Sequence, residues 1–85
     1  MQITILYFAS LREQVACSRE QVGLPHEVQT VGGLRVWMLA RGEPFASALA
    51  QGKAVRAAVN QQMARDDQAI VNGVEVAYFP PVTGG

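Results

Sequence analysis

Residues 74–85 read Val-Glu-Val-Ala-Tyr-Phe-Pro-Pro-Val-Thr-Gly-Gly, and this stretch decides the fold. Its β-branched and aromatic residues predict a last strand over residues 74–79. Pro80 and Pro81 remove two backbone donors and hold φ near an extended value, which ends the strand and directs the chain outward. The sequence therefore predicts a folded domain over residues 1–79 and an extended tail over residues 80–85, with a reach of roughly 20 Å at about 3.3 Å per residue.

The Gly84-Gly85 pair at the end of this stretch allows two interpretations. Chain ends are commonly disordered and rich in small residues, so the pair could be an ordinary frayed end. A frayed tail is usually polar, however, whereas this one continues directly from an apolar strand. Because neither glycine has a Cβ, the last two peptide units could pass through a slot that any side chain would block. This pattern favours a functional tail whose working group is the terminal carboxylate of Gly85.

Three further segments have the composition of strands. Residues 2–8 (QITILYF) are apolar on both faces, which predicts a strand in a central position of a sheet. Residues 19–24 predict a second strand, which Pro25 ends. Strand character returns over residues 53–60, and Asn72-Gly73 predicts a tight turn before the last strand.

Helix signals separate these strands. Thr30 is expected to cap the main helix, in which Val31, Leu34 and Met38 share one face and which Gly42 ends. Two shorter helices are expected. Ser10 would cap one over residues 11–15, with Glu13 in the capping-box position, and Pro44 would open the other over residues 43–50.

Two glycines, Gly32 and Gly33, fall in the first turn of the main helix. No GxGxxG or GxxxxGK[ST] pattern surrounds them, which argues against a nucleotide site. They either weaken the first turn by about 1 kcal/mol each or allow another segment to pack closely.

The order of these elements predicts the fold class. It is strand, strand, helix and then strands, with strongly apolar first and last strands. A sheet in which the two terminal strands lie side by side in parallel and grasp one helix accommodates this order. The expected fold is therefore α+β, a β-grasp (ubiquitin-like) fold with a mixed four- to five-stranded sheet packed on one main helix plus short helices.

Length and composition exclude several classes. Eighty-five residues make one domain, and 49% hydrophobic with 16% charged residues is typical of a globular chain that leaves apolar surface for a partner. The net charge is zero and the basic residues are scattered along the sequence, so the sequence predicts no basic patch that would bind nucleic acid. With no secretory leader and no apolar run near 18 residues, the chain is expected to be cytoplasmic and to make no membrane contact.

Cysteine and histidine offer little chemistry. Cys17 is the only cysteine, so neither an internal disulfide nor a cysteine-based metal cluster can form within one chain. As a nucleophile Cys17 would need a base, and nothing in the spacing places the only histidine, His26, beside it. A small, inert, half-buried thiol is the favoured interpretation, and one histidine makes no metal site.

A family resemblance covers essentially the whole chain. The segments that carry it are residues 7–13 (YFASLRE), Thr30-Val31 with Leu34, residues 58–60 (AVN) and residues 73–85. Together they resemble the small, sulfur-carrying subunit of molybdopterin synthase, in the ubiquitin-like family of sulfur carriers. The most specific piece is FPPVTGG at residues 79–85, because Gly-Gly alone is shared with ubiquitin and with the thiamine sulfur carrier.

This resemblance implies a definite chemistry at Gly85. An E1-like adenylyltransferase would use ATP to adenylate the Gly85 carboxylate, and a sulfur donor would convert it to a thiocarboxylate. The thiocarboxylate would donate sulfur to cyclic pyranopterin monophosphate in the large subunit of the synthase, within a heterotetramer. The tail residues Pro80, Pro81, Val82, Thr83 and Gly84 would insert into the partner. The chain itself would hold no permanent cofactor and no metal.

The resemblance also implies a partner-binding surface. Phe8, Met63 and Phe79 would form an apolar contact patch, with Arg12 adding a polar contact at its edge. Ordinary sheet core is the alternative for Phe8 and Phe79. Three other functions stay open at this point: a sulfur carrier for thiamine, a ubiquitin-like protein modifier, and an enzyme built on Cys17.

Overall fold

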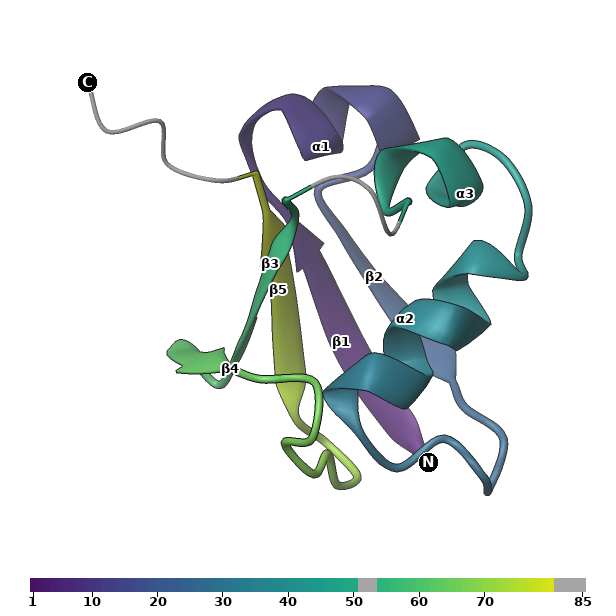
Figure 1. Cartoon of the computed structure of the whole chain (residues 1–85), viewed down its shortest axis with the longest axis vertical. Helices are drawn as coiled ribbons and strands as arrows, with labels where there is room; N and C mark the ends of the chain where they lie inside the picture. Colours follow the sequence, from purple (N-terminus) through teal and green to yellow (C-terminus); the bar gives the residue numbers. More distant parts are fainter. Residues whose placement is uncertain (51–53, 81–85) are drawn as a thin grey trace.

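Five strands form one mixed sheet in the computed structural model, which describes residues 1–50 and 54–80 (Figure 1). The order across the sheet is β2-β1-β5-β3-β4. β1 and β5, the first and last strands, are adjacent and parallel, and every other neighbouring pair is antiparallel. This confirms the predicted β-grasp arrangement. The strands are β1 (Gln2–Tyr7), β2 (Arg19–Gly23), β3 (Arg56–Val59), β4 (Gln62–Ala64) and β5 (Glu75–Phe79).

Three helices pack on one face of this sheet: α1 (Ala9–Val15), α2 (Val31–Leu39) and α3 (Phe45–Ala48) (Figure 1). The predicted cap of α2 is confirmed, because Thr30 Oγ1 accepts a hydrogen bond from the Gly33 N–H at 3.0 Å. The helix ends at Leu39, and Gly42 follows in the turn with φ +86°. None of these described helices has the length and apolar character needed to cross a bilayer.

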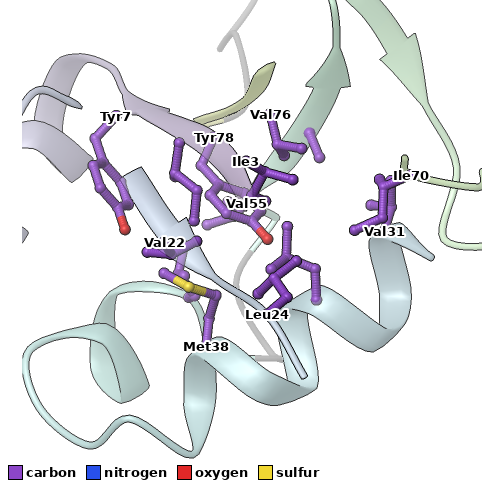
Figure 2. Close-up of a cluster of buried hydrophobic side chains, with 14 of the residues drawn as sticks. Ile3, Tyr7, Val22, Leu24, Val31, Met38, Val55, Ile70, Val76 and Tyr78 are labelled. Carbon is purple, nitrogen blue, oxygen red and sulfur yellow. The ribbon is translucent and has the colours of Figure 1, made fainter. Parts of the chain in front are cut away.

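The core lies between the helices and the sheet (Figure 2). Alternate residues of β1 and β5 point into it, and Tyr7, Val76 and Tyr78 are at most 1% exposed. The helix α2 contributes the face predicted from its three- and four-residue spacing. Its buried residues are Val31, Leu34 and Met38. Because every element contributes to one core, the sheet is held as a single layer with one covered and one uncovered face.

One predicted cap is wrong. Helix α1 begins at Ala9 rather than at residue 11, Phe8 occupies the cap position, and no side chain caps the helix. The parallel pairing explains the difference. The Phe8 N–H still donates to the Tyr78 carbonyl at 3.1 Å, and the chain then turns at once through Ala9, whose φ is +53°. Ser10 therefore already lies inside the first turn and cannot cap it.

β4 is not among the strands predicted from the sequence. This strand pairs with β3 through a two-residue turn at Asn60-Gln61, in which the φ angles are +48° and +70°. Two positive φ values are the signature of a type I′ hairpin turn, and the usual sequence signal for that turn is Asn-Gly. Gln61 stands where that signal has glycine, so the hairpin cannot be recognised from the sequence. The strand predicted over residues 53–60 is confirmed for Arg56–Val59, and its partner β4 was not predicted.

Gly32 settles one open alternative. Its N–H donates to the Asp66 carbonyl at 2.8 Å, and a Cβ on Gly32 would lie 3.1 Å from the Asp66 Cβ and 3.2 Å from the Asp66 carbonyl oxygen. Such separations are tighter than most real Cβ contacts. Gly32 therefore allows the turn after β4 to pack closely against α2.

Candidate functional site

The tail follows β5, the central strand of the sheet. β5 lies between β1 and β3, so the strand that ends at Phe79 is paired on both sides. Pro80 is half-buried and is the last residue that the structure describes. The other predicted tail residues, Pro81, Val82, Thr83, Gly84 and Gly85, lie outside the described residues.

Apolar side chains cross the uncovered face of the sheet in one row. The strand register aligns Leu6 with Ala77, Ala77 with Ala58, and Ala58 with Met63. Directly opposed residues point to the same face, and these alternate with the core residues of each strand. Ala58 and Ala77 are each 7% exposed although neither belongs to the core cluster. The side chains around them on the open face must therefore cover them.

The predicted contact residues lie around this row. Phe8 is 46% exposed and Met63 is 58% exposed, while Phe79 is half-buried and two residues beyond Ala77 on the same face of β5. Neither Phe8 nor Phe79 belongs to the core cluster, so the alternative that they are ordinary core is wrong. The outer patch consists of Leu6, Phe8, Ala58, Met63, Ala77 and Phe79.

Arg12 belongs to α1 rather than to the sheet. It is exposed and occupies the last turn of α1, the helix that follows Phe8 at the end of the sheet where β5 runs out (Figure 1). Sequence reasoning did not single out Leu6, Ala58 or Ala77. Only the strand register shows that they share a face with Met63.

A network of hydrogen-bonded polar and charged side chains lies on the face of the sheet opposite the outer patch. Tyr7 Oη donates to Glu20 Oε2 at 2.6 Å, and Arg41 donates to both Glu20 oxygens at 3.1 Å. Burial of the Glu20 carboxyl alone raises its pKa, but hydrogen bonds from Arg41 and Tyr7 and the charge of Arg41 outweigh this and lower the pKa. The same contacts raise the pKa of Arg41, and burial followed by the bond to Glu20 raises the pKa of Tyr7. β1, β2 and the turn after α2 are thereby tied together.

A second contact fixes the start of β3. Arg35, on α2, donates through Nη2 to the Val55 carbonyl at 2.6 Å, and its guanidinium lies 5.9 Å from the centre of the Tyr78 ring. The Tyr78 hydroxyl is fully buried and finds no hydrogen-bond partner within the described part of the chain. Burial therefore raises the pKa of Tyr78.

Conventional catalytic chemistry is not evident in the described ranges, residues 1–50 and 54–80. No group of three or more His, Cys, Asp or Glu side chains there could hold a metal ion. Cys17 is half-buried, as expected, and its thiol donates to the Arg19 carbonyl at 3.1 Å. His26 is exposed in the loop before α2. What these residues form is a partly exposed apolar patch on the sheet next to the strand that leads into the tail.

Comparisons with known proteins agree with this arrangement. The chain is 43% identical over 83 residues to the molybdopterin synthase sulfur carrier subunit of Escherichia coli (strain K12), which covers 98% of this chain and 99% of the relative. Among solved structures, it superposes on SAMP1 from Haloferax volcanii with a TM-score of 0.78 at 25% identity, covering 100% of both chains. It superposes on a putative molybdopterin converting factor subunit 1 from Pyrococcus furiosus with a TM-score of 0.77 at 26% identity, covering 96% and 99%. Since the model of the ThiS family also matches residues 5–85, the chain belongs to the ThiS family.

Proposed function

We propose that this chain is a sulfur carrier in molybdenum cofactor biosynthesis and acts as the small subunit of a molybdopterin synthase. The observation that carries the proposal is the 43% identity, over nearly the whole chain, to a relative of that name. The outer patch supports it, because a carrier that lends its C-terminus to other proteins needs a docking surface beside the tail. Exposed apolar groups such as Phe8 and Met63 are typical of such surfaces.

The proposed chemistry takes place at Gly85. A terminal carboxylate has a pKa near 3.5, so at neutral pH it is ionised and a poor acyl donor. In the activating enzyme the carboxylate oxygen attacks the α-phosphorus of ATP, and pyrophosphate leaves. A donor that supplies sulfur at the oxidation level of sulfide then attacks the acyl carbon, AMP leaves, and a thiocarboxylate remains. In the large subunit the thiocarboxylate sulfur bonds to a carbon of cyclic pyranopterin monophosphate and displaces an oxygen substituent from that carbon, which gives a thioester. Water then cleaves the acyl C–S bond, so that the sulfur stays on the pterin and Gly85 returns to a carboxylate.

On this proposal the chain works by presentation, and the partner enzymes supply the acids and bases. The tail, Pro80 to Gly84, enters the partner, while Phe8, Met63 and Phe79 bind beside the entrance and Arg12 contacts its edge. ATP binds in the activating enzyme, and the carrier keeps no cofactor of its own. The carrier and the large subunit would form a two-plus-two assembly in the cytoplasm.

Intact mass tests this function directly. The purified chain is incubated with the activating enzyme from the same genome, ATP and a sulfur source. Its mass should rise by about 16 Da, because sulfur replaces one oxygen at the terminus. The same mixture without ATP is the control. An unchanged mass in the complete mixture would refute the proposal.

A second candidate function is protein modification. It is favoured by the superposition on SAMP1, a small archaeal modifier protein. An activated Gly85 could acylate lysine amines on other proteins as readily as it accepts sulfur. Gly-Gly remnants on lysines in digested lysates would show modification, whereas a dedicated carrier leaves none. Complementation of strains that lack either the molybdopterin or the thiamine carrier separates the two sulfur pathways.

A further inference from the structure

Two arginines lie next to apolar residues of the outer patch and in register with them. Arg19 on β2 is directly opposite Leu6 on β1, and Arg56 on β3 is directly opposite Phe79 on β5. Opposed residues in a sheet share a face, so both side chains lie on the uncovered face. Both residues are exposed.

Neither guanidinium forms a salt bridge or a hydrogen bond with another described residue. Among residues 1–50 and 54–80, the salt bridge that forms joins Arg41 to Glu20, and the side chains of Arg19 and Arg56 make no hydrogen bond. An arginine side chain presents five donors in a planar fork that matches a carboxylate. Two such groups are therefore available to a partner at the margin of an apolar patch.

The charges on this face are arranged asymmetrically along the strands. The carboxylate that β5 contributes to the open face is Glu75, opposite Thr4, four residues before Phe79. At about 3.3 Å per residue, Glu75 lies roughly 13 Å from the level of Phe79 and Arg56. The two arginines and Glu75 therefore lie at different levels along the strands of this face, which favours one orientation of a partner.

The strand order fixes how far apart the two arginines are. β2 and β3 are separated by β1 and β5, so three inter-strand spacings lie between Arg19 and Arg56. Arg19 is level with Ala77 and Arg56 with Phe79, two residues further along β5. At about 4.8 Å per spacing and about 3.3 Å per residue, their backbone positions are roughly 16 Å apart. A matching surface would carry two acidic groups at a comparable separation, with apolar side chains between them.

We infer that Arg19 and Arg56 determine partner specificity, each pairing with a carboxylate on the large subunit. The inference rests on the proposed function, which supplies the large subunit as the partner. The position of the patch on and beside β5, the strand that leads into the tail, supports this occupant, because a partner that covers the patch also lies next to the root of the tail. Charged groups at the rim of an interface act chiefly on orientation, association rate and discrimination between partners.

Binding of the complete chain to the large subunit from the same genome tests the inference. Arg19→Gln and Arg56→Gln should each weaken binding about five-fold at low salt, mainly through the association rate, and high salt should reduce the difference. Arg19→Glu and Arg56→Glu should weaken binding more than ten-fold, because like charges then face each other. Arg56→Lys, which keeps the charge, should recover most of the affinity.

Gln29→Glu is the matched control. It makes the chain more negative by the same one unit as Arg→Gln, and it lies in the loop before α2, at the end of the molecule near Met1. If the arginine variants bind no more weakly than this control, the inference is wrong while the proposed function stands. If the unaltered chain neither gains sulfur nor binds the large subunit, the proposed function fails and the inference fails with it. Melting temperatures of all variants should stay close to that of the unaltered chain, because the substituted side chains are exposed.

Discussion

Two buried tyrosines on neighbouring strands differ in one respect, the partner of the hydroxyl. Tyr7 donates to Glu20 at 2.6 Å, whereas Tyr78 has no partner among the described residues. Tyr7→Phe should therefore lower the free energy of unfolding by about 1–2 kcal/mol, because a hydrogen bond to a charged acceptor is lost. Tyr78→Phe should leave it unchanged or raise it, because a buried unpaired hydroxyl is removed. Urea denaturation measures both, and a larger loss for Tyr78→Phe than for Tyr7→Phe would contradict the assignment.

Glu20 should make stability depend on acid pH. Its pKa in the folded protein is below the ordinary value of 4.5, so the folded state binds fewer protons than the unfolded state as the pH approaches that value. The stabilisation is therefore fully present above about pH 4.5 and is lost as the pH falls through the lower, folded pKa. Glu20→Gln should lower the unfolding free energy by about 1–2 kcal/mol at pH 7 and flatten its decline in acid.

A thermal denaturation series from neutral to acid pH checks this prediction. The matched control is Glu27→Gln, because the Glu27 side chain is exposed and makes no hydrogen bond with another described residue. The free energy of unfolding of this variant at pH 7 should equal that of the unaltered chain. An acid decline that persists undiminished in Glu20→Gln would mean that other carboxylates cause it.

At the scale of elements, the β3–β4 hairpin carries local strain. Gln61 has φ +70° at the second turn position, a region that non-glycine residues enter at a cost of roughly 1 kcal/mol. Gln61→Gly should raise the free energy of unfolding by about 0.5–1 kcal/mol, since Asn-Gly is the preferred pair for this turn. The same substitution one residue later, Gln62→Gly, falls within β4 and should lower stability by a similar amount. Chemical denaturation should show opposite signs for the two variants.

The elements differ in how well the sequence predicts them. β1, β5 and α2 are long enough for their apolar spacing and the Thr30 cap to identify them, and their order was enough to predict the β-grasp fold. β4 has three residues, and its turn needs positive φ values, which a glutamine at position 61 does not indicate. The start of α1 differs from the prediction because Phe8 still pairs with β5 through its N–H and the Tyr78 carbonyl. This is a long-range contact that local residue preferences do not encode.

The outer patch shows the same limit. Phe8, Met63 and Phe79 came from the family resemblance, and the structure brings them to one face. The row that joins them contains alanines, and alanine is common in both core and surface. Only the register, which aligns Ala77 with Ala58 and Ala58 with Met63, identifies these alanines as part of a surface. The sequence gives no comparable signal for strand register, because register depends on turn geometry and on pairing between distant segments.

At the scale of the whole molecule, the proposed function places stability and partner binding on opposite faces of one sheet. Figure 1 shows the helices on one side of the sheet, where the core also lies. The strand register places the outer patch on the other face. Two exposed apolar residues allow this separation to be tested, because Met63 on the open face is 58% exposed and Val36 on α2 is 60% exposed. Met63→Ala and Val36→Ala should both leave the free energy of unfolding within about 0.5 kcal/mol of the unaltered chain.

Binding to the large subunit should distinguish the two variants, although their stabilities should be the same. Met63→Ala should weaken binding to the large subunit about ten-fold, because an apolar contact worth roughly 1–2 kcal/mol is lost, whereas Val36→Ala should bind normally. Deletion of Gly85 should give the converse result, with nearly normal melting and binding but no gain of mass in the activation assay. Calorimetry, binding and intact mass on the same three proteins measure the three properties separately. A tail deletion that lowered the melting temperature substantially would show that the tail packs on the domain, and equal binding by both alanine variants would exclude Met63 from the docking face.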